Sequence, residues 1–169
     1  MRTPATAHDC TRPCADALEM LTHDQEQTRA LADECRRVVH HIEGDARMQP
    51  LAEALCRAMR RMAALEEDLF FPAARAALEA SALVDIAELE HATARQIIAQ
   101  LQLADPCEAR YEALVLALTE CVERHARHEQ AQLFPRLRES CLDMTALGER
   151  LNERLGEPDE GTSAVAAAH

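Results

Sequence analysis

The sequence predicts an all-α fold: a four-helix bundle in up-down-up-down order, followed by a short fifth helix. Hydrophobic residues make up 48% of the 169 residues but aromatic residues only 2%, and there are only 4 glycines, a composition that favours packed helices over sheets. Apolar residues also recur at steps of three and four along four long segments. Short connections join these segments, so consecutive helices should run antiparallel.

The first helix is expected from about residue 14 to residue 42, where Gly44 follows as a stop signal. The second is expected to begin near Pro50, because a proline at the first helical position costs no hydrogen bond. Pro72 should then kink or interrupt this helix, because proline lacks the N–H that an α-helix interior requires.

The third helix is expected over residues 83–103, with an inward stripe through Ile86, Leu89 or Glu90, Ala94, Ile97 and Leu101. Asp105-Pro106 is a helix-start signal for a fourth helix that extends to about residue 141.

A shorter helix is expected near residues 144–155. The domain organisation is therefore an N-terminal arm at 1–13, the bundle at 14–155 and a disordered tail at 156–169, whose composition is small and polar.

A formal net charge of −12 argues against nucleic acid and anionic membranes as partners. No apolar run reaches the roughly 18 residues of a membrane span, and the first residues lack the apolar stretch of a signal peptide. The expected location is the cytoplasm. Metal ions, small ligands or an unidentified protein remain as partners, with the chain a monomer or a dimer.

The chain has 7 cysteines, widely spread and without a CxxC pair, so a disulfide framework is not expected. Most are interpreted as small buried hydrophobic residues. An alternative is that Cys10 and Cys14, four residues apart, form a redox or soft-metal pair.

One motif occurs twice in the sequence. A glutamate stands six residues before a proline in both copies, Glu66 before Pro72 and Glu129 before Pro135, with a phenylalanine directly before each proline. The two copies fall on the second and fourth predicted helices, which places them on alternate helices of the bundle.

The two copies differ four residues upstream of the glutamate, where His125 stands in one and Met62 in the other. Four residues are about 400° of helix rotation, so His125 and Glu129 project from one face and are able to bind the same ion. Gln25 also interrupts an apolar stripe, on the first helix.

Burying an unpaired carboxylate costs several kcal/mol, so Glu66 and Glu129 require a cation or a proton beside them. His91 on the third helix completes a set of two imidazoles and two carboxylates, which suits iron, manganese or zinc. Taken singly, the same residues have ordinary interpretations: Glu66-Glu67-Asp68 as a solvated acidic run, and His91 as a surface or satisfied core histidine.

Together these motifs resemble the hemerythrin-like, HHE cation-binding family over nearly the whole chain. The matching stretches are Asp16–Leu21, Leu65–Ala73, Glu90–Ala92, His125–Glu129, Leu133–Pro135 and Leu142–Leu151. The resemblance implies a four-helix bundle that holds two iron ions, with Glu66 and Glu129 as bridging carboxylates. It also implies one histidine ligand from each of the four helices.

Two of the four implied histidines are absent: the helix 1 position is Gln25 and the helix 2 position is Met62. In the family both positions serve the same iron, so the resemblance implies one intact half-site and one modified pocket lined by Gln25 and Met62. The intact half-site, expected to hold a single ion, consists of Glu66, His91, His125 and Glu129.

Two further histidines are alternative ligands. His23 lies two residues before Gln25, about 200° around the helix and thus away from its face. His128 lies three residues after His125, so it borders the same face as a ligand or as the partner of a carboxylate.

The resemblance implies a non-haem iron protein that binds or senses dioxygen or nitric oxide, or handles iron, with zinc or manganese as alternative metals. Two other classes stay open. One is a low-turnover oxidoreductase acting on peroxide, nitric oxide or thiols, with Cys121 one turn before His125. The other is a metal-free or zinc-bound bundle that acts through protein contacts.

Overall fold

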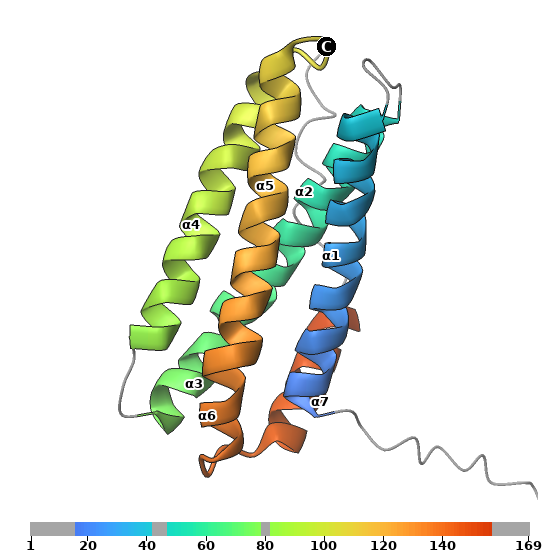
Figure 1. The fold of residues 1–169 in the computed structure, drawn as a ribbon. Helices are drawn as coiled ribbons and strands as arrows, with labels where there is room; N and C mark the ends of the chain where they lie inside the picture. Colours follow the sequence, from blue (N-terminus) through green and yellow to red (C-terminus); the bar gives the residue numbers. More distant parts are fainter. Residues whose placement is uncertain (1–15, 42–46, 79–81, 157–169) are drawn as a thin grey trace, which may run out of the picture.

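The computed structural model describes residues 16–41, 47–78 and 82–156, and the regular elements in these ranges are helices (Figure 1). They are α1 (Ala17–His41), α2 (Met48–Leu65), η1 (Glu66–Phe70), α3 (Phe71–Ala77), α4 (Ala82–Leu103), α5 (Ala109–His128), η2 (Glu129–Leu133), α6 (Phe134–Arg138) and α7 (Met144–Gly156). The predicted all-α bundle with a short fifth helix is confirmed. The predicted arm at 1–13 and residues 157–169 of the predicted tail lie outside the described residues.

The long helices α1, α2, α4 and α5 alternate in direction along the bundle (Figure 1). Helix α1 packs against α2 and α5, and α4 packs against α5 and α2. Helix α7 contacts α1 and η1 at the end of the bundle where α3 and α6 also lie. Across the described helices, no segment combines the length and the apolar character that a membrane crossing requires.

The first two helices start with simple local chemistry. The Glu19 N–H donates to Asp16 Oδ1 at 2.9 Å, which satisfies one of the free N–H groups at the start of α1. Helix α2 begins at Met48, so Pro50 is its third residue, still within the first turn where an N–H has no helical acceptor.

The predicted helix start at Asp105-Pro106 is wrong, because α5 begins at Ala109. Asp105 is engaged in a turn instead. Its Oδ1 accepts the Cys107 N–H at 2.9 Å, and its carbonyl oxygen accepts the Glu108 N–H at 3.0 Å. Asp commonly forms such a turn with the backbone two residues on, in competition with a helix cap.

Both copies of the repeated motif form a π-helical turn that begins at the motif glutamate. The Phe71 N–H donates to the Glu66 carbonyl and the Phe134 N–H to the Glu129 carbonyl, each five residues back. The proline that follows cannot donate to the carbonyl four residues back, and its ring crowds that carbonyl. Pro72 therefore interrupts the regular α-helical bonding as predicted, but the helix does not end there: it continues as α3.

The core consists of two apolar clusters at different heights of the bundle. One contains Leu55, Met59, Met62, Ile98, Leu118 and Val122 among others, and the second contains Leu18, Leu21, Phe70, Phe71, Leu133 and Phe134 among others. The positions between these two sets along the helices belong to polar side chains that are at most 1% exposed: Gln25, Glu66, His91, His125 and Glu129. The bundle thus encloses a polar layer between two dry ones.

The inward face of α4 follows the predicted stripe at Glu90, Ala94 and Leu101, which are buried, and differs from it at the start of the helix. Val84 and Ala87 are buried, whereas Ile86 is 42% exposed and Leu89 is 67% exposed. Apolar residues occupy both faces of this helix, and its buried face carries the polar Glu90. Hydrophobic periodicity alone therefore favoured the wrong residues at the start of α4.

The described cysteines are free thiols in two environments. Cys35, Cys56 and Cys121 are buried, whereas Cys107 and Cys141 are exposed. Burial, together with the neighbouring Cys56, raises the pKa of the Cys35 thiol to about 11. Cys10 and Cys14 lie outside the described residues.

Because the thiolate is the reactive form, iodoacetamide at neutral pH should modify Cys107 and Cys141 in the folded protein and spare Cys35. Mass spectrometry of proteolytic peptides after timed alkylation measures each site separately. The denatured protein is the control, in which all of these thiols should react. Equal rates at Cys35 and Cys107 in the folded protein would show that the core around Cys35 opens readily.

Candidate metal centre

The polar layer contains a compact group of possible metal ligands from three elements. Glu66 begins η1, His91 lies in α4 and His125 lies in α5, and one ligand atom from each lies within 4.8 Å of the others. Glu66 Oε2 is 3.0 Å from His91 Nε2 and 3.1 Å from His125 Nε2. All three side chains are 0% exposed.

Glu129 lies beside this group, one helical turn after His125. Its Oε2 is 3.6 Å from His125 Nε2, and the side chain is 0% exposed. The structure therefore brings the two repeated glutamates and the two histidines to the same layer of the bundle.

Several polar atoms of this layer have no hydrogen-bond partner. Glu66 Oε1, Glu129 Oε1 and His91 Nε2 are all buried and unsatisfied. Leaving such groups unpaired away from water is costly. Carboxylate oxygens and neutral imidazole nitrogens are ligand types shared by iron, zinc and manganese, so this donor set fits a divalent cation.

The buried carboxyl and imidazole groups of the centre shift one another's pKa values. Burial would raise the pKa of the Glu66 carboxyl, but His125 and His91 lower it. Burial would lower the pKa of His125, but Glu129 and Glu66 raise it well above its ordinary value. Burial and the Glu66 carboxylate raise the pKa of Glu129. These shifts favour the protonated forms of His125 and Glu129 in the metal-free centre, in a place where a cation would otherwise balance the carboxylates.

Each histidine has a carboxylate on its outer nitrogen. Glu67 Oε1 lies 2.9 Å from His91 Nδ1, and Glu90 Oε2 lies 3.4 Å from His125 Nδ1. A carboxylate only accepts hydrogen bonds, so these contacts favour a proton on Nδ1 and direct each Nε2 into the centre. Arg95 Nη1 donates to the same Glu67 oxygen at 2.6 Å and helps to hold it in place.

The sequence did not reveal these two outer carboxylates. Glu67 belongs to the acidic run Glu66-Glu67-Asp68, whose members have separate environments: buried, half-buried and exposed, respectively. Glu90 is visible in the sequence only as the neighbour of His91, and its contact with His125 depends on how α4 packs against α5. The sequence signal that could have revealed them is their position next to a candidate ligand: Glu90 directly precedes His91, and Glu67 directly follows Glu66.

Gln25 lies in the polar layer, whereas Met62 belongs to the adjacent apolar cluster. Gln25 Nε2 donates to Glu129 Oε2 at 2.6 Å, and Gln130 Nε2 donates to Gln25 Oε1 at 2.8 Å. The amide is thus engaged at both ends. Met62 is 1% exposed and packs within the apolar cluster that contains Met59.

The two alternative ligands lie outside the group. His23 is exposed, and its Nε2 is 2.8 Å from Gln27 Nε2. His128 is 8% exposed, and its Nδ1 is 3.5 Å from Glu90 Oε2, so it contacts a carboxylate that also contacts His125.

Aromatic rings close one side of the centre. The Phe71 ring stacks on His91 with centroids 5.3 Å apart, and the His91 and His125 rings are 4.6 Å apart. Phe70 and Phe134, one from each copy of the motif, meet edge to face at 5.8 Å. The two motif copies therefore join directly beneath the polar layer and exclude water from that side.

The sequence matches the Hemerythrin HHE cation binding domain over residues 16–137, which spans the whole bundle from the start of α1 to α6. No curated protein matches the chain. Among solved structures, the fold is similar to the crystal structure of a hemerythrin HHE cation binding domain-containing protein from Mycobacterium kansasii. That similarity has a TM-score of 0.68 at 22% identity and covers 83% of this chain and 85% of the other. The chain, whose buried Glu66, His91 and His125 form a cluster consistent with a metal site, belongs to the hemerythrin HHE cation-binding domain family.

Proposed function

We propose that this protein binds one non-haem iron ion through Glu66, His91 and His125, with Glu129 as the adjacent carboxylate. The bound ion would serve to bind or sense dioxygen or nitric oxide, or to handle iron. The observation that carries the proposal is the meeting of three buried ligand atoms within 4.8 Å, in a layer where Glu66 Oε1 and Glu129 Oε1 lack hydrogen-bond partners.

A single ion is proposed because the second position has been rebuilt with groups that bind metals poorly. The Gln25 carbonyl oxygen, the atom of the amide that would bind a metal, accepts from Gln130 at 2.8 Å, and the amide nitrogen donates to Glu129 at 2.6 Å. Met62 contributes an apolar thioether, a soft and weak ligand for iron. Gln25 thus contacts Glu129 through a neutral hydrogen-bond donor and adds no positive charge of the kind that a second cation would supply.

Iron bound here would supply open coordination positions for a small diatomic ligand. The protein itself contributes orientation and a dry environment. Glu67 and Glu90 hold the imidazoles of His91 and His125 with their Nε2 atoms inward, and the apolar clusters above and below keep water away.

The proposal is tested by elemental analysis of protein purified without added metal, followed by anaerobic titration of the metal-free form with iron(II) and with zinc. One iron per chain is the expected result. Zinc in place of iron would retain the site but remove the diatomic ligand from the proposal. A chain that holds no metal and takes up neither ion would instead be the metal-free alternative.

The same titration should depend on pH. A metal requires neutral imidazole and ionised carboxylate, whereas the raised pKa values of His125 and Glu129 favour the protonated form of both groups in the metal-free protein. Affinity for the metal should therefore fall as the solution is acidified, and binding should release protons. Calorimetry in buffers of different ionisation enthalpy counts these protons. A binding heat that is the same in all buffers would contradict the expectation.

A further inference from the structure

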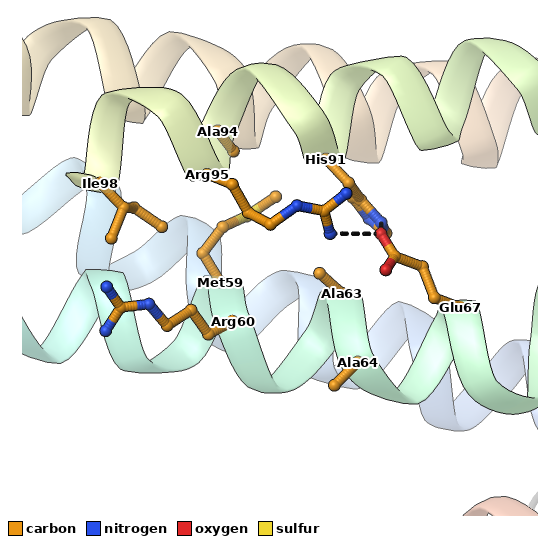
Figure 2. Close-up of a pocket in the computed structure, with 9 residues that line it drawn as sticks. All are labelled: Met59, Arg60, Ala63, Ala64, Glu67, His91, Ala94, Arg95 and Ile98. Carbon is orange, nitrogen blue, oxygen red and sulfur yellow. Dashed lines mark hydrogen bonds and ion pairs between the residues drawn. The ribbon is translucent and has the colours of Figure 1, made fainter. Parts of the chain in front are cut away.

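A groove between α2 and α4 lies directly outside the metal centre (Figure 2). Its volume is about 190 Å³, and it is lined by Met59, Arg60, Ala63, Ala64, Glu67, His91, Ala94, Arg95 and Ile98. This volume is below the roughly 300–1,000 Å³ of sites for drug-sized ligands, so any occupant must be small.

The inner wall of the groove is apolar. Met59, Ala63, Ala94 and Ile98 are all buried, and they form the floor between the two helices. Charged groups stand at the rim. In Figure 2, Arg60 extends toward the end of the groove marked by Ile98, and Arg95 extends toward the end marked by Glu67 and His91.

The charged residues that line the groove have a net positive charge, whereas the whole chain is negatively charged. The protein has a net charge of −12, but the groove is lined by two arginines and one glutamate. Arg95 pairs with Glu67 at 2.6 Å. Arg60 makes no ion pair with any residue in the described part of the chain, so its guanidinium remains available beside the apolar floor.

We propose that this groove binds a small organic anion, a short aliphatic carboxylate, whose charged end pairs with Arg60 and whose apolar part lies on Met59 and Ile98. Arginine provides parallel N–H donors that match a carboxylate. The apolar floor distinguishes such a ligand from an inorganic anion, and the positive lining disfavours a cation. His91 of the metal centre borders the groove, but the proposed contacts of the ligand are with Arg60, Met59 and Ile98, which lie outside the metal centre.

Butyrate is a suitable probe, followed by the methyl NMR signals of methionine and isoleucine. Saturable shifts are expected for the Met59 and Ile98 methyl groups, with a millimolar dissociation constant. Arg60→Gln should weaken this binding about fivefold or more, the size of effect that loss of a charge-assisted contact produces at a partly exposed site. The matched control is Arg57→Gln on the same helix, an exposed arginine that pairs with Glu53 at 3.9 Å, and it should leave the binding unchanged.

Three outcomes would overturn the proposal. They are the absence of saturable shifts at Met59 and Ile98, equal weakening by Arg57→Gln and Arg60→Gln, and equal binding of butylammonium or inorganic phosphate. The titration is carried out on both the metal-free and the zinc-loaded protein, where the same affinities are expected. A failure of metal binding therefore leaves this test intact, and a failure of butyrate binding leaves the metal centre intact.

Discussion

Replacing His125 by alanine is expected to lower the affinity for metal by more than about 100-fold, since even loss of an outer partner of a ligand costs about 10–100-fold. The substitution removes the imidazole that faces both Glu66 and Glu129. It also leaves Glu66 without its principal positive partner, so the metal-free protein should lose about 3 kcal/mol of unfolding free energy. Metal titration and urea unfolding monitored by circular dichroism measure the two effects.

The matched control is His23→Ala, which removes an exposed histidine and should change neither quantity. His128→Ala is informative in a different way. If His128 acts only through Glu90, its loss should weaken metal binding far less than the loss of His125. Unchanged metal content and unchanged stability in His125→Ala would favour a bundle that acts without metal.

The double substitution Gln25→His with Met62→His is expected to raise the metal content from one ion to two per chain. Both side chains are 1% exposed, Gln25 in contact with Glu129 and Met62 one helical turn before Glu66, so imidazoles placed there would add two donors beside these carboxylates. The replacement also removes the amide that now donates to Glu129 Oε2, which leaves that oxygen free for a second cation. Elemental analysis and the absorption spectrum after iron loading measure the outcome.

The control for the double substitution is Gln25→Leu with Met62→Leu, which fills similar volume without adding ligands and should leave at most one ion. Each single histidine variant should fall short of two ions, because one imidazole does not complete the second set. A second ion already present in the natural chain would contradict the rebuilt half-site. A single ion in the double histidine variant would mean that the second position is blocked by packing as well as by chemistry.

Helical periodicity was sufficient to predict the bundle, because long stripes at three-and-four spacing leave few other ways to bury them. The pairing of His125 with Glu129 could also be predicted from the sequence, since a spacing of four residues places both side chains on one face of a helix. The contact of His91 with these residues depends on how far along the bundle axis each helix lies relative to its neighbours. The sequence constrains those positions only if short connections make consecutive helices antiparallel.

The outer carboxylates and the face of α4 were not predictable by the same reasoning. Glu67 and Glu90 act across helix interfaces, where the relevant distances are set by packing rather than by spacing along the chain. On α4, alanine and polar residues occupy the buried face while Ile86 is exposed, so a hydrophobicity pattern carries little information there. The start of α5 was predicted too early for a local reason. Asp105 forms a turn with Cys107 and does not cap the helix.

The π-helical turns at Glu66 and Glu129 change the direction in which the side chains before and after them point. A π turn adds one residue to a helical turn, which offsets the downstream residues by about 100° relative to a continuous α-helix. Each helix therefore has two stretches with different rotational settings. The first contains the motif glutamate and the residue four before it, His125 or Met62. The second turns the following phenylalanine and leucine side chains into the apolar cluster at the end of the bundle. The orientation of the polar side chains and the packing of the bundle end are thereby set by separate stretches of one helix, and the two stretches join at the motif glutamate.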